Sequence, residues 1–220
     1  MLYVWELIFI EVGMIVICMG VCLCLFLVQG MQKRQKEELI ARLKRDLDRM
    51  VKGEIPYQVA LLKIKGVTLF HLSVILKQFG PLICGEEGEL FKAELGETLL
   101  KPQLKEWMKS RRFVKRVVAV QIMGFIQDEE GLLGFLKDAS PLVRLNAMLG
   151  AMNLKTVKSI EGIIEAMARE APLARYSYRD AFLRRDETIY AMLKERLNQE
   201  TDPCIRECCL EVLKDQGTPW

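Results

Sequence analysis

The sequence contains three prolines at a constant interval of 31 residues, and an arginine follows each proline three positions later. The pairs are Pro141 with Arg144, Pro172 with Arg175, and Pro203 with Arg206. A fixed period of about 20 to 50 residues is typical of chains that stack short similar units, each of which buries its apolar face against its neighbours. The period therefore predicts a surface for binding rather than an active-site cleft.

Each repeated unit is predicted to hold two helices. Apolar residues recur at intervals of three and four before and after each proline, for example Leu142, Leu145 and Leu149 after the first. Such intervals place side chains on one stripe of a helix. Proline suits the first turn of the second helix because the N–H that it lacks would have no partner there. Ser140 and Asp202, each directly before a proline, are predicted N-caps.

The repeated arginines are expected to serve the fold rather than a ligand. Arginine supplies a rigid fork of donors that suits carbonyls or carboxylates in the turn between two helices, and this is the role predicted for Arg144, Arg175 and Arg206. A weaker copy of the unit, 28 residues before the first proline, keeps the arginine as Arg116 but lacks the proline.

The sequence around the first proline, LKDASPLVR followed by Ala147, resembles a HEAT repeat, and the 31-residue period is similar to that of short bacterial-type HEAT repeats. Tyr178 and Cys209 depart from the pattern, because they occupy the position of the small residue. The resemblance covers about residues 99–216 and implies a curved α-solenoid of antiparallel helix pairs that serves as a docking scaffold. Since strand-like alternation is nearly absent from the chain, an all-α fold is expected throughout.

Four segments are predicted: a transmembrane anchor at residues 1–30, a juxtamembrane amphipathic helix at 31–56, a helical segment with degenerate repeats or a cap at 57–98, and HEAT-like repeats at 99–220. In the third segment, residues 67–79 are apolar enough for a buried helix that ends at Gly80 and Pro81. Its predicted core includes Phe70, Val74 and Leu76. No glycine pattern suited to phosphate binding follows it.

Residues 7–28 are predicted to lie in the membrane, because a helix of about 20 apolar residues crosses about 30 Å of hydrocarbon. Residues 12–28 carry no charge. Acidic residues precede this run and no small-residue cleavage pattern follows it, which favours an uncleaved anchor over a signal peptide. The bases Lys33, Arg34 and Lys36 follow it, so the N-terminus is predicted outside and the repeats in the cytoplasm.

Glu11 lies at the edge of this run and has two interpretations: a solvated residue at the outer interface, or a contact with another membrane protein.

The helix predicted after the span also has two interpretations. Its stripe of Leu39, Leu43, Leu47 and Met50 could pack on the first repeat or on a second copy. Alternatively, bases on this helix could contact anionic lipid. These bases are Arg42, Lys44, Arg45 and Arg49.

Two groups of candidate binding residues follow. In the usual HEAT layout the second helices line the concave face, which implies contacts to a protein partner from Asn146, Arg179 and Glu207. The alternative is binding of phosphate, from anionic lipid or nucleic acid, by a basic cluster whose only opposing charge is Glu106. This cluster comprises Lys105, Lys109, Arg111, Arg112, Lys115 and Arg116, and it could equally be a solvated face.

Catalytic patterns are weak in this sequence, so no enzyme activity, cofactor or metal is predicted. His71 is the only histidine and has no partner motif. Cys204, Cys208 and Cys209 lack a fourth ligand for zinc. The formal net charge of +3 is too small to indicate nucleic acid binding. The expected function is that of a membrane-anchored adaptor that binds a protein partner at the cytoplasmic face.

Overall fold

The structure is a computed structural model that describes residues 19, 33–35, 37–64, 67–183 and 187–214. The chain divides into two compact units, Met1–Ile55 and Pro56–Trp220, and each is considered by itself. The predicted span at residues 12–28, with Glu11, lies outside the described residues. Among the residues that are described, no helix has the length and apolar character needed to cross a bilayer.

The first unit is helical over residues 37–51. Its buried side chains are Leu43, Leu47 and Met50, which lie on one stripe of the helix. The helix ends at Gly53, which has a φ of 73°. The N–H of Gly53 donates to the Met50 carbonyl at 2.9 Å, and the N–H of Glu54 donates to the Arg49 carbonyl at 2.9 Å. This pair of bonds is a Schellman motif, which glycine favours because it adopts positive φ without steric cost.

The described part of the second unit contains helices and no strand, so the predicted all-α class is confirmed for these residues. The α-helices are α2 (Tyr57–Ile64), α3 (Leu69–Phe79), α4 (Gly85–Glu94), α5 (Lys101–Met108), α6 (Phe113–Ile126), α7 (Glu129–Phe135), α8 (Pro141–Met152), α9 (Val157–Arg169), α10 (Pro172–Leu183), α11 (Glu187–Gln199) and α12 (Pro203–Lys214). A short 3-10 helix, η1 (Gly80–Leu82), follows α3, and a π-helix, η2 (Leu95–Leu100), joins α4 to α5.

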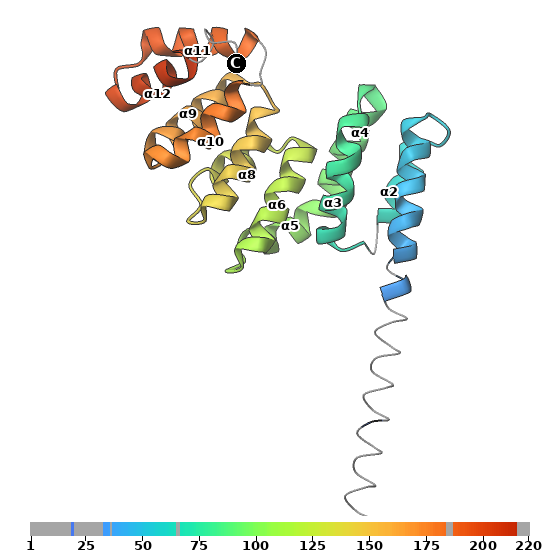
Figure 1. The fold of residues 1–220 in the computed structure, drawn as a ribbon. Coiled ribbons are helices and arrows are strands. Elements are labelled where there is room, and N and C mark those ends of the chain that lie inside the picture. The colour runs from blue at the N-terminus through green and yellow to red at the C-terminus, as the bar shows by residue number, and fades with distance from the viewer. Residues whose placement is uncertain (1–18, 20–32, 36, 65–66, 184–186, 215–220) are drawn as a thin grey trace, which may run out of the picture. The chain divides into compact units, whose positions relative to one another are not determined.

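Helices α5 to α12 form four consecutive pairs, each a first helix packed on a second helix. The second helices contact one another in the order α6, α8, α10 and α12, and α3 packs on the free side of α6. The first helices contact one another in the order α7, α9 and α11. Figure 1 shows α6, α8 and α10 side by side. The pairs therefore form two layers, with the core between them.

The helix starts follow the proline period. Helices α8, α10 and α12 begin at Pro141, Pro172 and Pro203, and α6 begins at the equivalent Phe113. Asp202 acts as the predicted N-cap and accepts from the N–H of Cys204 at 2.8 Å. Ser140 occupies the predicted N-cap position of α8, but its side chain makes no capping hydrogen bond. Its N–H donates to Asp138 Oδ1 at 2.8 Å.

The predicted core of α3 is partly wrong. Leu76 is buried as predicted, but Phe70 and Val74 are half exposed. The buried face contains Leu69, Leu72, Ile75, Leu76 and Phe79, at intervals of three, three, one and three. Phe70 and Val74 lie on the opposite face, because α3 packs on α6 from one side only.

Two glycines bring α6 and α8 close together. A Cβ added at Gly124 would lie 3.2 Å from the Cα of Gly150. A Cβ at Gly150 would meet Leu132 at 2.9 Å and the Cα of Gly124 at 3.4 Å. A side chain at either position would therefore require its neighbours to shift. Gly150 lies inside α8, and it does not interrupt the helix.

Candidate functional site

Four arginines at equivalent positions bind the turn that precedes their own helix. Arg116 Nη1 donates to the carbonyl of Ser110 at 2.7 Å, and Arg144 Nη1 donates to that of Asp138 at 2.8 Å. In the next two units the equivalent bonds run from Arg175 Nε to Glu170 O at 3.2 Å, and from Arg206 Nη1 to Glu200 O at 3.0 Å. The predicted role of the repeated arginines in the turns is confirmed.

Three of these arginines also reach forward to the next unit: Arg175 approaches Glu207 of α12 at 3.7 Å, and the other two make bidentate pairs. Arg116 pairs with both carboxylate oxygens of Asp138, at 2.7 and 3.0 Å. Arg144 pairs in the same two-fold manner with Glu170, with Nη2 to Oε2 at 2.9 Å. Bidentate pairs of this kind fix relative orientation as well as distance. The arginines therefore connect consecutive helix pairs.

Burial and hydrogen bonding shift the pKa values of groups in these pairs. Burial would raise the pKa of Asp138, but donation from Arg116 and from the N–H of Ser140 outweighs it, and the pKa is lowered overall. Tyr178, which stands where the repeat expects a small residue, is buried, and burial with the nearby Glu170 carboxylate raises its pKa to about 12. Its hydroxyl donates to Glu170 at 3.4 Å.

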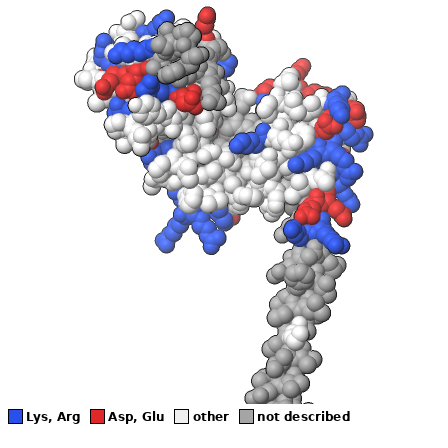
Figure 2. All heavy atoms as spheres, viewed as in Figure 1, with Lys and Arg blue, Asp and Glu red and all other residues white. Residues whose placement is uncertain are grey.

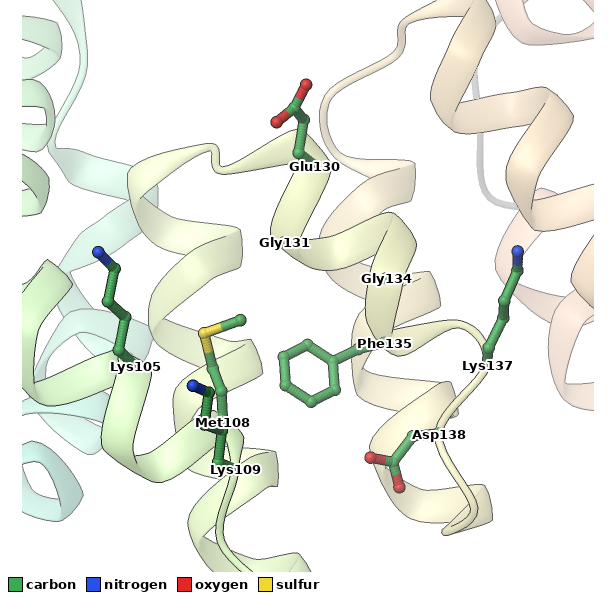
Figure 3. A pocket seen from close by; sticks show the side chains of 9 residues that line it. All are labelled: Lys105, Met108, Lys109, Glu130, Gly131, Gly134, Phe135, Lys137 and Asp138. Carbon is green, nitrogen blue, oxygen red and sulfur yellow. The ribbon is translucent and has the colours of Figure 1, made fainter.

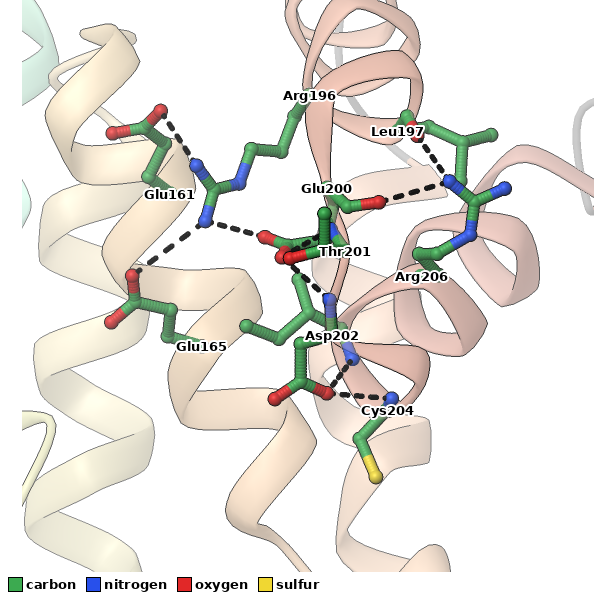
Figure 4. A network of polar contacts seen from close by, with 10 residues as sticks. Glu161, Glu165, Arg196, Leu197, Glu200, Thr201, Asp202, Cys204 and Arg206 are labelled. Carbon is green, nitrogen blue, oxygen red and sulfur yellow. Dashed lines mark hydrogen bonds and ion pairs between the residues drawn. The ribbon is translucent and has the colours of Figure 1, made fainter.

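A further network connects α9 with α11 (Figure 4). Arg196 approaches Glu161, Glu165 and Glu200 at 3.5, 3.9 and 2.6 Å. Glu200 also accepts from the N–H groups of Thr201 and Asp202 at 2.8 and 2.9 Å, and these backbone bonds lower its pKa. The network extends the arginine contacts into the last pair of helices.

The three residues predicted to bind a protein partner lie on consecutive second helices. Asn146 accepts from Gln121 Nε2 at 3.0 Å and donates to the Leu142 carbonyl at 2.8 Å, so its amide joins α6 to α8. Arg179 lies 5.1 Å from the ring centroid of Tyr176. Glu207 is exposed and lies 3.7 Å from Arg175. It lines a shallow hollow on α12 together with Cys204, Arg206, Leu210, Glu211 and Lys214.

Sequence reasoning missed an exposed row of apolar side chains on these helices. Val114, Leu142 and Leu173 stand at the position after the proline, or its equivalent in α6, and are 50%, 53% and 83% exposed. Leu142 and Leu149 were predicted on the buried stripe of α8, and this was wrong, because α8 buries Val143, Ala147, Met148, Ala151 and Met152 instead. The alignment of the repeats could have shown that one apolar position recurs off this stripe. We refer to Val114, Leu142, Leu173 and the exposed Tyr176 as the apolar row.

Charge is unevenly distributed over the second unit. Figure 2 shows one face whose middle carries few charged side chains, with bases gathered at its lower edge. Of the predicted basic cluster, Lys105, Lys109, Arg111 and Arg112 are exposed at the end of α5 and in the following turn. The Lys115 amine lies 5.2 Å above the Trp107 ring. Arg116 differs from the others, because its guanidinium is occupied by Asp138 and the turn carbonyls.

A pocket of about 400 Å³ lies between α5 and α7 (Figure 3). These two helices are not among the closely packed pairs, whereas α7 with α9 and α9 with α11 are. Met108 and Phe135 point toward each other across it, and Lys105 and Lys109 stand on its α5 side. Its other lining residues are Glu130, Gly131, Gly134, Lys137 and Asp138.

The groups considered for metal binding or catalysis are His71 and the cysteines of α12. Among the described residues, no group of three histidines, cysteines or acids is placed to hold a metal ion. Cys208 and Cys209 are buried while Cys204 is exposed, and burial raises the pKa of the Cys208 thiol to about 11. The Nδ1 atom of His71 lies 2.7 Å from the hydroxyl of Thr68, the N-cap of α3.

Comparison with known proteins adds no relative: the chain matches no family model, no curated protein and no solved structure. The fold class therefore comes from the structure itself, in which the described residues form an all-α protein.

Proposed function

We propose that this protein is a membrane-attached α-solenoid of the HEAT type, which holds a protein partner against its second helices at the cytoplasmic face of the membrane. The repeat period, the two layers of helix pairs and the arginine contacts in four successive turns support the solenoid assignment. The uncharged run at residues 12–28 and the bases after it support attachment and orientation.

The apolar row is the observation that carries this proposal. Three large apolar residues recur at one position of three neighbouring helices and remain exposed. Scattered exposed apolar residues need no explanation, whereas a continuous apolar surface marks an interaction site. Contact of α6 with α8, and of α8 with α10, places these three exposed residues on neighbouring helices.

The spacing of the apolar row indicates which kind of partner fits it. Packed helices lie about 8–10 Å apart, so equivalent positions on neighbouring second helices recur at this interval. Residues seven apart on one α-helix are separated by about 10.5 Å, because the rise is about 1.5 Å per residue. The occupant we propose is therefore an amphipathic helix of a protein partner, which lies across the second helices and places an apolar residue at every seventh position on the row. Asn146, Arg179 and Glu207 lie on α8, α10 and α12 and are the polar contacts proposed for this helix.

A photocrosslinking amino acid placed at Leu142 or Leu173 tests this function in native membranes. One dominant protein should be captured from both positions, and capture should persist when nuclease treatment and a high-salt wash precede irradiation. The substitutions Leu142→Glu and Leu173→Glu, made together with the crosslinker at Tyr176, should abolish capture. Val157→Glu, also with the crosslinker at Tyr176, is the matched control and should leave capture unchanged, because Val157 is about as exposed as Leu142 but lies on the first helix α9. Equal loss of capture in Val157→Glu and in the double substitution would contradict the proposal.

The exposed bases favour a second candidate function, the binding of anionic phosphate groups. Lys105, Lys109, Arg111 and Arg112 gather at one turn with no ion pair among the described residues. Electrostatic phosphate binding weakens steeply with salt, whereas an apolar protein interface need not. Loss of all capture when the high-salt wash precedes irradiation would therefore favour this second function over the first.

A further inference from the structure

We propose that the pocket between α5 and α7 binds an anionic amphiphile: a single aliphatic chain that carries a phosphate or carboxylate group. The inference rests on the second function above only in its use of Lys105 and Lys109, and it adds an apolar site to what would otherwise be a surface charge. It does not depend on the apolar row, which lies on the second helices.

The floor of the pocket is apolar and open. Met108 from α5 and Phe135 from α7 face each other across it (Figure 3). Its volume of about 400 Å³ lies within the range of pockets that bind small ligands, about 300–1,000 Å³. An aliphatic chain between these two side chains would be removed from water on both sides, which is the main source of affinity for such a ligand.

Gly134 keeps this space free. A Cβ added at Gly134 would meet no atom within 4 Å, and the backbone is not in the left-handed region. Alanine would therefore fit here, and it would favour the helix by about 0.5–1 kcal/mol relative to glycine. Because glycine has no side chain, the wall of the pocket is flat at Gly134, although alanine would also fit there. The geometry points to a chain that lies against this wall.

The charge on the rim of the pocket indicates the head group of the ligand. Lys105 and Lys109 line the α5 side, and no described residue makes an ion pair or hydrogen bond with either amine. The Lys137 amine points away from the gap between Met108 and Phe135. Of the acids, Asp138 is already paired with Arg116, and Glu130 points outward at the far end. The free positive charges therefore stand on the α5 side of an apolar pocket, and an anionic amphiphile suits this combination of apolar lining and unpaired lysines.

The test uses the full chain in vesicles of phosphatidylcholine, with dodecyl phosphate that carries a photoreactive diazirine on its chain. After irradiation, mass spectrometry should find the label on the peptides that contain Met108 and Phe135. Unlabelled dodecyl phosphate and dodecanoate should compete, whereas dodecanol and inorganic phosphate should not. Equal competition by dodecanol would overturn the anionic part of the proposal, and competition by inorganic phosphate would reduce it to simple phosphate binding.

Two variants test whether the label binds in this pocket. Gly134→Leu fills the pocket and should lower labelling about tenfold or more, corresponding to the loss of about 1.4 kcal/mol. Circular dichroism checks that this variant folds. Lys105→Glu with Lys109→Glu should lower labelling to a similar extent. Lys158→Glu with Lys194→Glu is the matched control: it makes the same charge change at exposed lysines of α9 and α11, outside the pocket and outside the basic cluster, and labelling should remain within about twofold.

These outcomes separate a site from general attraction. Equal losses in both charge variants, or unchanged labelling in Gly134→Leu, would overturn the proposal. Vesicles with added lysophosphatidylglycerol, a single-chain anionic lipid, distinguish the source of the ligand: competition assigns a membrane lipid, and its absence assigns a free amphiphile. A failure of this test leaves capture at the apolar row unaffected, so the two proposals stand or fall separately.

Discussion

The Arg116 guanidinium donates to both carboxylate oxygens of Asp138, at 2.7 and 3.0 Å, across an interval of 22 residues. The same arginine donates to the carbonyl of Ser110, in the turn before its own helix. One side chain thus closes a turn and connects two helix pairs. Arg144 repeats both functions one unit later, through the carbonyl of Asp138 and the carboxylate of Glu170. This repetition means that the orientation of each pair depends on an ion pair as well as on apolar packing.

Removal of the first of these arginines should destabilise the fold. Arg116→Ala leaves Asp138 largely buried without its partner, which should lower the free energy of unfolding by about 3 kcal/mol. The measurement is urea denaturation of the full chain in mild detergent, followed by circular dichroism. Arg112→Ala is the matched control, because Arg112 is exposed on the same turn, and its effect should stay within about 0.5 kcal/mol. Equal effects of the two substitutions would assign Arg116 to the surface cluster instead.

The same ion pair predicts a pH dependence of stability. The pKa of Asp138 is lowered in the folded protein, so its contribution is present above the pKa of an unfolded aspartate, about 3.9, and is lost as the pH falls through the folded value. The difference in unfolding free energy between the native chain and Asp138→Asn should therefore be largest near neutral pH and should shrink below about pH 4. In an Arg116→Ala background this pH dependence should diminish. A difference that stays constant from pH 3 to pH 7 would refute the prediction.

Two glycine-to-alanine substitutions should change stability in opposite directions. Gly124→Ala places a Cβ 3.2 Å from the backbone of Gly150, and separation of α6 from α8 should lower the free energy of unfolding by about 1 kcal/mol or more. Gly134→Ala meets no atom within 4 Å and should raise it by about 0.5 kcal/mol through helix propensity. Thermal unfolding of both variants under one set of conditions measures the two signs. Stabilisation by Gly124→Ala would show that the α6–α8 contact is looser than it is here.

Thiol labelling should separate the cysteines of α12. Cys84 and Cys204 are exposed, whereas Cys208 and Cys209 are buried, and burial raises the pKa of both buried thiols. Since the thiolate is the reactive form, maleimide at pH 7.5 should modify the exposed pair and spare the buried pair until the protein is unfolded. Trypsin cleaves after Arg206, so Cys204 and the buried pair fall in different peptides for mass spectrometry. Rapid labelling of Cys208 in the folded protein would contradict the burial of this helix face.

Much of the helix arrangement could be predicted from the sequence, because it depends on residues close together in the chain. A proline that starts a helix and an arginine that binds carbonyls five or six residues earlier act within one turn, and this turn recurs in each unit. The candidate binding residues were less predictable. Asn146 was expected to be free for a partner, but it is joined to Gln121 on the neighbouring helix. Asn146 remains partly exposed, so it can add a polar contact to a partner, while the apolar row carries the proposed interface.

The sequence by itself therefore determined the helical class, the period, the helix starts at the prolines and the role of the arginines in the turns. Only the tertiary structure decided which apolar residues are buried, as Phe70, Val74 and Leu142 demonstrate. It also decided the forward pairing of Arg116 with Asp138 and the pocket between α5 and α7. The physical reason is that local hydrogen bonding fixes where a helix begins, whereas burial depends on the direction from which neighbouring helices approach.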